Sequence, residues 1–374
     1  MNFELTEEQQ LIQDSVQRFV SDHYELEARQ KLAGTKQGFS SEHWQTMAEL
    51  GWLGLLLPEV DGGFGGNQID AMLLMEQFGK GLVLEPYLAS VVLGAQTLSR
   101  GGSAELKQQL LPGVIEGSVQ LALAYAEEQA RFDLHDVVTH ARIEGDHFVL
   151  SGNKSMVQHA ASASHLIVSA RTSGGQVDED GITLLLIPAD SAGVTVTGFP
   201  TVDGQQAAEI KLDNVEVDIR HVLGEVGQGF KLLNTAILDG ILAVSAEAVG
   251  AMEVLYKDTV AYTSEREQFD HPLSDFQVLQ HRMVDMFMEY EQCKSLLYRA
   301  TLETTQAADS AQRTVHALKH FVGKAGIMIG ENAVQLHGGM GMTEELRVGH
   351  YFKRLLVIDA MFGNSDYHLQ KFAA

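Results

Sequence analysis

The chain has 374 residues, 45% of them apolar, so it is long enough to bury a substantial core and disorder is not expected. Its 26 basic and 50 acidic residues give a net charge of −24, which repels phosphate backbones and anionic bilayers at long range. We therefore expect no nucleic-acid partner and no membrane insertion. An anionic small ligand would need local donors, such as helix N-termini or single Arg side chains.

The single cysteine, Cys293, cannot form an intramolecular disulfide, and the histidines show no metal-ligand spacing coupled to cysteine or acidic residues. The N-terminus lacks the basic and apolar regions of an export signal, and no uninterrupted apolar stretch is long enough to span a bilayer. These features predict a metal-free cytoplasmic protein.

Residues 1–119 are predicted to form an N-terminal α-helical domain. Apolar residues recur at helical spacing over 5–24, and Thr6 precedes acidic residues suited to a helix start. Proline and glycines interrupt the pattern at LPEVDGGFGG, after which helices are expected over 69–79 and on to about residue 116.

Residues 120–223 are predicted to form a middle β domain, because short runs rich in Val and Ile, such as HLIVSA and ITLLLIPA, are bounded by turn residues. The helical period returns over 231–263, 275–305 and 310–337, and residues 224–374 are expected to form a helical bundle. The expected fold class is therefore α+β.

Two motifs carry a resemblance to a known family. REQFDHPLSDFQ, from Arg266 to Gln277, resembles the Arg-x-x-Phe-Gly-x-Pro-Leu-x-x-Phe-Gln segment of acyl-CoA dehydrogenases, and AVQLHGGMGMTEE resembles their Gln-x-x-Gly-Gly-x-Gly segment. LGWLGLLLPEVDGGFGG and the order of helical, β and helical regions extend the likeness over nearly the whole chain. Within the family, the chain most resembles the small subunit of pimeloyl-CoA dehydrogenase and similar members of paired-subunit enzymes.

The resemblance implies a three-part fold with a middle β barrel or sandwich and a C-terminal four-helix bundle. It also implies an FAD-dependent oxidoreductase that converts an acyl-CoA thioester to its 2,3-enoyl form, as in fatty acid β-oxidation. Electron-transfer flavoprotein is the implied electron acceptor. In this chemistry a carboxylate removes the α proton while the flavin takes hydride from the β carbon.

The resemblance implies that the ADP half of FAD is bound across a subunit interface by residues of the two motifs, a guanidinium and glycines suited to a pyrophosphate. The expected cofactor-binding residues here are Arg266, Phe269, Gln277, Gln335, Gly338 and Gly339. One departure is Asp270, which stands where the family has Gly and adds a negative charge near the expected phosphates.

The flavin half departs much further from the family pattern. In place of the Thr-Glu-Pro-x-x-Gly-Ser-Asp loop the chain has AEEQARFD, where Ala126, Arg131 and Phe132 replace Thr, Gly and Ser while Glu127 matches. In place of Trp-Ile-Thr-Asn-Gly it has MVQHA over 156–160, where Gln158 keeps the ability to donate a hydrogen bond to the flavin.

Both positions at which the family carries its catalytic carboxylate hold residues that cannot act as a base. Phe362 stands at the usual Glu and Gly240 at the alternative one. Asp239, one residue away, is a weak candidate because neighbouring helix residues point about 100° apart. A solvated acid is the simpler interpretation of Asp359 and Asp366. Lys353 and Arg354 are open to two interpretations, CoA phosphate contacts or salt bridges.

These features favour a non-catalytic or weakly catalytic subunit that shares an FAD site with a homologous large subunit, with self-association also open. Two alternatives remain at this level. One is a self-sufficient dehydrogenase with a relocated base such as Asp239, and the other is a flavin-free scaffold subunit.

Overall fold

The computed structural model describes residues 5–374 and divides the chain into two compact units. One unit comprises Leu32–Gly66 and Leu84–Gly240. The other comprises Met1–Lys31, Asn67–Val83 and Ile241–Ala374. The boundaries expected after residues 119 and 223 remain predictions.

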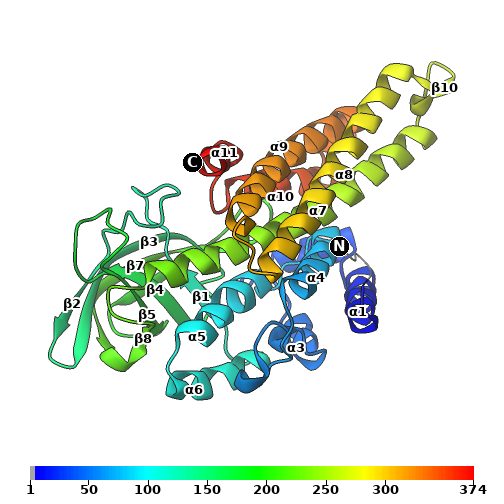
Figure 1. The fold of residues 1–374 in the computed structure, drawn as a ribbon. Helices are drawn as coiled ribbons and strands as arrows, with labels where there is room; N and C mark the ends of the chain where they lie inside the picture. The colour runs from blue at the N-terminus through cyan, green and yellow to red at the C-terminus, as the bar shows by residue number, and fades with distance from the viewer. Residues whose placement is uncertain (1–4) are drawn as a thin grey trace. The chain divides into compact units, whose positions relative to one another are not determined.

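The first unit contains the β sheet (Figure 1). Its strands are β1 (Leu121–Ala124), β2 (His140–Glu144), β3 (His147–Gln158), β4 (His165–Arg171), β5 (Ile182–Pro188), β6 (Val194–Pro200), β7 (Gln206–Asp218) and β8 (Val222–Leu223). The strand order is β6-β7-β3-β2-β4-β5-β8, and β1 pairs in parallel with β4. A single register pair, His140 with Arg171, joins β2 to β4, so the sheet consists of two halves with a narrow connection.

The burial patterns of the strands explain why they could be predicted from the sequence. Along β7, Ala208, Ile210 and Leu212 are buried and the intervening residues are exposed, as expected when one face covers a core. β5 is buried along nearly its whole length, which explains its continuous apolar run.

Helices of the same unit accompany the sheet: α3 (Ser41–Glu49), the π-helix η3 (Leu88–Ala95), α5 (Gln96–Gly101) and α6 (Ala104–Ile115). The π-helix is buried throughout and packs against β1, where Gly94 leaves room for Leu121. The Ser90 hydroxyl accepts a hydrogen bond from the Leu121 amide at 3.1 Å.

The second unit is helical. Its helices are α1 (Glu7–His23), α2 (Leu26–Ala33), α4 (Gln68–Gly81), α8 (Gln277–Thr305), α9 (Ala311–His337), α10 (Arg347–Ala360) and α11 (Ser365–Ala373), together with most of α7 (Phe230–Glu265). Thr6 caps α1 as expected, in a capping box with Gln9. α7 is long and apolar enough to cross a bilayer, but 78% of its most apolar window is buried, as in a core helix.

α4 and α7 touch through their backbones. A Cβ added at Gly79 would lie 1.9 Å from the carbonyl oxygen of Glu247, and one added at Gly250 would lie 1.9 Å from that of Glu76. Beside this contact, Arg354 of α10 donates two hydrogen bonds to the Glu247 carboxylate at 2.6 and 2.7 Å. Arg354 is therefore a buried structural cation, which argues against the CoA phosphate contact considered above.

Candidate cofactor site

The two sequence motifs meet at one end of the helical bundle. α7 ends at Glu265 and continues into a hairpin of β9 (Glu267–Gln268) and β10 (His271–Pro272), which leads to α8; Figure 1 shows this hairpin at the tip of the helices. α9 runs beside α8 and ends at His337. Tyr262 near the end of α7 stacks on His337 with ring centroids 4.2 Å apart, which brings both motifs to the same end.

Every expected ADP-binding residue is exposed at this end of the unit. They are Arg266, Phe269, Gln277, Gln335, Gly338 and Gly339. Phe269 is 85% exposed, and no ion pair to Arg266 occurs within residues 5–374. A guanidinium and a phenyl ring offered to solvent on a helical scaffold fit the binding of a phosphate and a flat ring.

The turn after α9 has the backbone expected of a phosphate cradle. Gly338 has φ 61° and ψ −142°, a conformation essentially restricted to glycine. A Cβ added at Gly338 or Gly339 would meet no atom within 4 Å, so the backbone there is open to an approaching anion. His337 itself is buried, and its ring Nδ1 lies 2.8 Å from the Ala333 carbonyl oxygen, so it supports the turn.

The hairpin turn holds two non-glycine residues in the left-handed region, Phe269 at φ 56° and Asp270 at φ 66°. Two-residue hairpin turns of this type demand positive φ at both positions, which usually selects Asn or Gly. The turn is thus strained, and it carries Phe269 at the tip of the hairpin. The turn was not predicted from the sequence because neither of its central residues is glycine.

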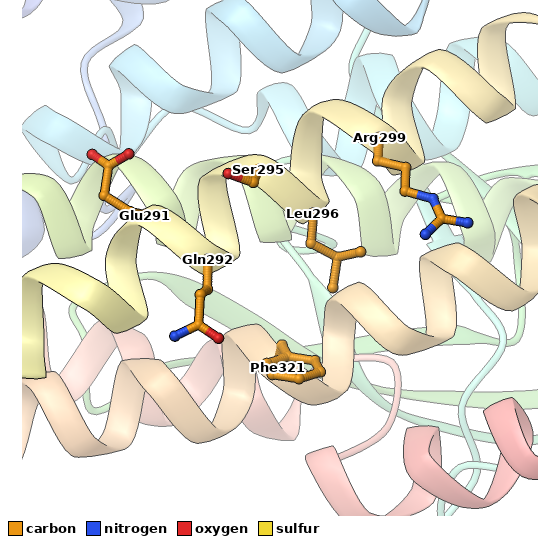
Figure 2. Close-up of a pocket in the computed structure, with 6 residues that line it drawn as sticks. All are labelled: Glu291, Gln292, Ser295, Leu296, Arg299 and Phe321. Carbon is orange, nitrogen blue, oxygen red and sulfur yellow. The ribbon is translucent and has the colours of Figure 1, made fainter.

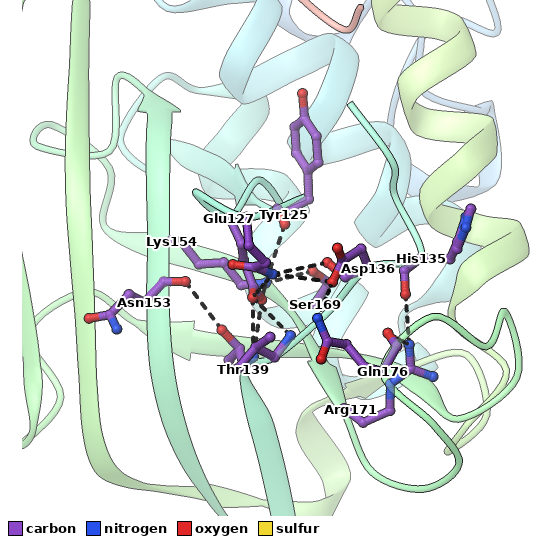
Figure 3. A network of polar contacts seen from close by, with 12 residues as sticks. Tyr125, Glu127, His135, Asp136, Thr139, Asn153, Lys154, Ser169, Arg171 and Gln176 are labelled. Atoms are coloured by element: carbon purple, nitrogen blue, oxygen red, sulfur yellow. Dashed lines mark hydrogen bonds and ion pairs between the residues drawn. The ribbon is translucent and has the colours of Figure 1, made fainter. Parts of the chain in front are cut away.

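The loop after β1, at the family's flavin-binding position, is anchored by a buried ion pair (Figure 3). The Lys154 ammonium lies 2.7 Å from the Glu127 carboxylate and also donates to the Ser169 hydroxyl and the Tyr125 carbonyl. Glu127 in turn accepts backbone hydrogen bonds from Val138 and Thr139. One carboxylate therefore ties both ends of the 127–139 loop to β3.

For each of these two residues, burial and the ion pair shift the pKa in opposite directions. Burial would raise the pKa of Glu127, but the Lys154 charge and the hydrogen bonds more than offset it and leave the pKa below its ordinary value. Burial lowers the pKa of Lys154 to about 8 although Glu127 opposes this. Glu127, which matches the family pattern, holds the loop, and Lys154 is a positioning residue that was not predicted from the sequence.

At the other positions where the family contacts the flavin ring, this chain has few groups that could stack on the ring or hydrogen-bond to it. Arg131 is exposed and adopts φ 51° where the family has Gly. Met156 sits at a register shift of β3, 55% exposed with φ 52°, in place of the family's Trp. Gln158 ends β3 and is half-buried.

The turn around Phe362, where the family carries its catalytic Glu, is held by hydrogen bonds to its main chain although the acidic side chain is missing. Phe362 is buried with φ 58°. Lys319, fully buried on α9, donates to the carbonyls of Asp359 and Gly363 at 2.9 and 2.8 Å, and His368 Nε2 lies 3.1 Å from the Phe362 carbonyl. Because these bonds all go to the main chain, the turn does not depend on the side chain at position 362.

The structure also shows the surroundings of Gly240, at the family's alternative base position, and of its neighbour Asp239. Gly240 is buried within α7, and the buried Asp239 carboxylate lies 2.5 Å from Nη1 of Arg100, whose side chain is partly exposed. The Asp239 carboxylate is therefore already engaged by a guanidinium on a neighbouring helix. This geometry argues against Asp239 as a relocated base.

The chain matches the domain models of one known family along nearly its whole length. Residues 6–118, 122–215 and 227–374 match the N-terminal, middle and C-terminal domains of acyl-CoA dehydrogenases. Probable acyl-CoA dehydrogenase YngJ of Bacillus subtilis is 30% identical over 371 residues, covering 98% of this chain and 97% of that protein.

Two solved structures superpose closely. The ChsE4-ChsE5 complex from Mycobacterium tuberculosis gives a TM-score of 0.91 at 26% identity, covering 100% of this chain and 98% of the other. The FAD complex of PigA gives 0.92 at 25% identity with the same coverage.

The three matched domains thus place the chain in a family of flavin-dependent oxidoreductases. The chain belongs to the acyl-CoA dehydrogenase family, with the helical, β and helical domains of that fold, and homologues in this family bind FAD. The predicted fold class is confirmed. The relatives are distant and do not select a subfamily.

Proposed function

We propose that this chain is the partner subunit of a heteromeric, FAD-dependent acyl-CoA dehydrogenase, and that it contributes the ADP-binding end of a flavin site whose catalytic end belongs to a homologous large subunit. The observation that carries this proposal is the contrast between two regions. The phosphate-binding end is exposed and preformed around Gly338, whereas position 362 holds a buried phenyl ring. The similarity to a chain of the ChsE4-ChsE5 complex supports a paired assembly.

When bound, FAD supplies hydride acceptance from the β carbon of an acyl-CoA thioester. In this proposal the chain's own residues act on the nucleotide end. Arg266 presents paired donors to a pyrophosphate, Phe269 covers a flat ring, and the 338–339 backbone admits a phosphate oxygen closely. Gln277 and Gln335 add side-chain amides at the edge of the ADP-binding site. Electron-transfer flavoprotein is the expected electron acceptor.

The lone chain should oxidise acyl-CoA poorly even if FAD binds, because a missing general base typically removes roughly 10²- to 10⁴-fold in rate. The test is to purify the chain with and without a co-expressed homologous large subunit, and to compare flavin absorbance with acyl-CoA oxidation. Robust turnover by the lone chain would refute the partner-subunit role.

A matched pair of Arg variants tests whether Arg266 contributes to FAD binding by the complex. Arg266→Ala should weaken FAD retention by the complex roughly 10- to 100-fold, since a hydrogen bond to a charged group contributes about 1.5–3 kcal/mol. Arg282→Ala is the control, because Arg282 is also exposed and, among the residues from 5 to 374, its side chain donates only to Asn332, at 3.4 Å. Equal flavin content in both variants would favour the flavin-free scaffold.

A further inference from the structure

Helix α9 faces two different environments within the helical unit. On one side it borders a surface groove of about 510 Å³, where Figure 2 shows Phe321 pointing toward Leu296 of α8. His316 and Lys319 point away from this groove, because at about 100° per residue they lie roughly 140° and 160° from Phe321 around the helix. Both side chains are buried, on the side of α9 that packs against α11 and the 361–364 turn before it.

A pair of buried imidazoles joins α9 to α11. The Nδ1 atoms of His316 and His368 lie 2.9 Å apart, and the ring centroids are 5.1 Å apart. His368 is fully buried, and His316 is 8% exposed. The ring of His368 also places its Nε2 atom 3.1 Å from the carbonyl oxygen of Phe362. One side chain of α11 therefore contacts both α9 and the 361–364 turn.

These contacts determine where the protons of the neutral pair lie. A carbonyl oxygen can only accept, so Nε2 of His368 carries the proton and its Nδ1 accepts. Nδ1 of His316 then donates to it. The hydrogen bond between the rings requires a neutral His368, because a proton added to its Nδ1 would set two N–H donors against each other.

Lysines on both helices add positive charge near the pair. Lys319 of α9 is fully buried and donates to main-chain carbonyls at the end of α10 and in the 361–364 turn, at 2.9 and 2.8 Å. The ring of Tyr367 packs edge-on against that of His368, with centroids 5.3 Å apart. Burial, aided by Lys371, lowers the pKa of His316 to about 4. Burial, aided by Lys319 and His316, lowers the pKa of His368 to about 3.

The other charged side chains between α9 and α11 have partners of their own. The carboxylate of Asp359 accepts a hydrogen bond from the Ser365 amide at 3.0 Å, and Asp366 pairs with Lys324 at 3.3 Å. Arg313 of α9 donates to a main-chain carbonyl near the end of α11 at 3.1 Å. Within residues 5–374 no carboxylate forms an ion pair with either imidazole, so no acidic group compensates a proton added to the pair.

We propose that His316 and His368 form an acid-sensitive latch that holds α11 and the 361–364 turn on α9. Near neutral pH both imidazoles are uncharged, and the hydrogen bond between them is intact. When His368 takes up a proton, the two rings become facing donors beside the Lys319 ammonium, and α11 detaches so that both rings are protonated in water. The turn then loses the His368 contact to the Phe362 carbonyl. The inference is independent of the flavin proposal, because it involves none of the expected cofactor-binding residues.

The pKa values set the size of the effect. In the attached form they are about 4 and about 3, whereas in the detached form they return to the ordinary imidazole value of about 6.5. The detached form therefore binds more protons, and attachment weakens as pH falls below about 6.5. At pH 5 each imidazole favours detachment about 30-fold, so the equilibrium constant for detachment should rise roughly 10³-fold between pH 7.5 and pH 5.

Amide hydrogen exchange on the full-length chain tests the latch. Relative to the intrinsic rate at each pH, exchange of the α11 amides should accelerate roughly 10³-fold from pH 7.5 to pH 5. Detachment exposes little surface, so low urea concentrations should not change this rate, whereas α8 amides, which need global unfolding, should exchange faster in urea. An unchanged α11 rate at pH 5, or the same rate and urea dependence in α11 and α8, would overturn the proposal.

Two matched variants identify the group that responds to acid. His368→Gln still offers a side-chain amide to the Phe362 carbonyl but cannot be charged, so the acid response should fall to roughly 30-fold, the share of His316. His320→Gln is the control. Nδ1 of His320 lies 2.8 Å from the Ser365 carbonyl oxygen and donates in both protonation states, so the full response should remain. A full response in His368→Gln, or an equally reduced one in His320→Gln, would contradict the latch.

Nitrogen NMR of the wild-type chain provides a test that does not depend on the folding of a variant. With isotope-labelled histidine at pH 7.5, His316 should carry its proton on Nδ1 and His368 on Nε2. A proton on Nδ1 of His368 in the neutral pair would rule out the hydrogen bond on which the latch depends.

Discussion

Removal of the Lys154 ammonium should strongly destabilise the compact unit that contains the β sheet. In Lys154→Met the Glu127 carboxylate stays buried and loses its 2.7 Å charged partner, keeping its backbone hydrogen bonds. Breaking one side of a buried ion pair typically costs about 3–5 kcal/mol, because an uncompensated charge remains. We expect a loss of this size in the free energy of unfolding. The amides of Val138 and Thr139 should also exchange faster with solvent.

The double variant Lys154→Met with Glu127→Gln should lose less than the sum of the single changes, by about 1–3 kcal/mol, because the Gln oxygen still accepts from the loop amides without a charge. Urea denaturation and hydrogen exchange measure both effects. Lys211→Met, at an exposed site on β7, is the control and should change stability by less than about 0.5 kcal/mol. Equal effects of Lys154→Met and Lys211→Met would refute the anchoring role.

Three further changes test other parts of the structure. Burial lowers the pKa of His316 to about 4 and that of His368 to about 3, so the unfolded chain takes up protons first and stability should fall as pH drops below about 6.5. The loss should be on the order of 3 kcal/mol from His316 alone, measured by urea unfolding against pH, and a flat profile would contradict it. Gly338→Ala should destabilise by about 1–3 kcal/mol through its backbone conformation, whereas Gly339→Ala should not, and equal melting temperatures would disprove the distinction. Asp239→Asn should leave acyl-CoA oxidation by the complex within about twofold, and a loss of roughly 10²-fold would instead make Asp239 the base.

Long periodic segments were predictable from the sequence. The helix expected over 231–263 lies within α7, because burial of one face imposes a period of 3.6 on a helix. The apolar runs HLIVSA and ITLLLIPA, expected as strands, lie in β4 and β5. The π-helix over Leu88–Ala95 was not predictable, since an all-apolar run carries no period that separates it from an α-helix.

Side-chain partners far apart in sequence were also beyond prediction. Glu127 and Lys154 are 27 positions apart, and Asp239 meets Arg100 across 139 positions. Each of these residues, taken alone, is typical of a solvated surface. The positive φ of Phe269 escaped prediction for a related reason, because surrounding structure imposes a conformation that its own chemistry disfavours.

The glycine contact between α4 and α7 limits how the helical unit can move. At Gly79 and Gly250, a carbonyl oxygen of the facing helix occupies the space that a side chain would need. If either helix rotated about its axis or slid by one turn, a larger residue would clash with the facing helix at this contact. Any rearrangement that accompanies ligand binding must therefore carry the two helices as one rigid body.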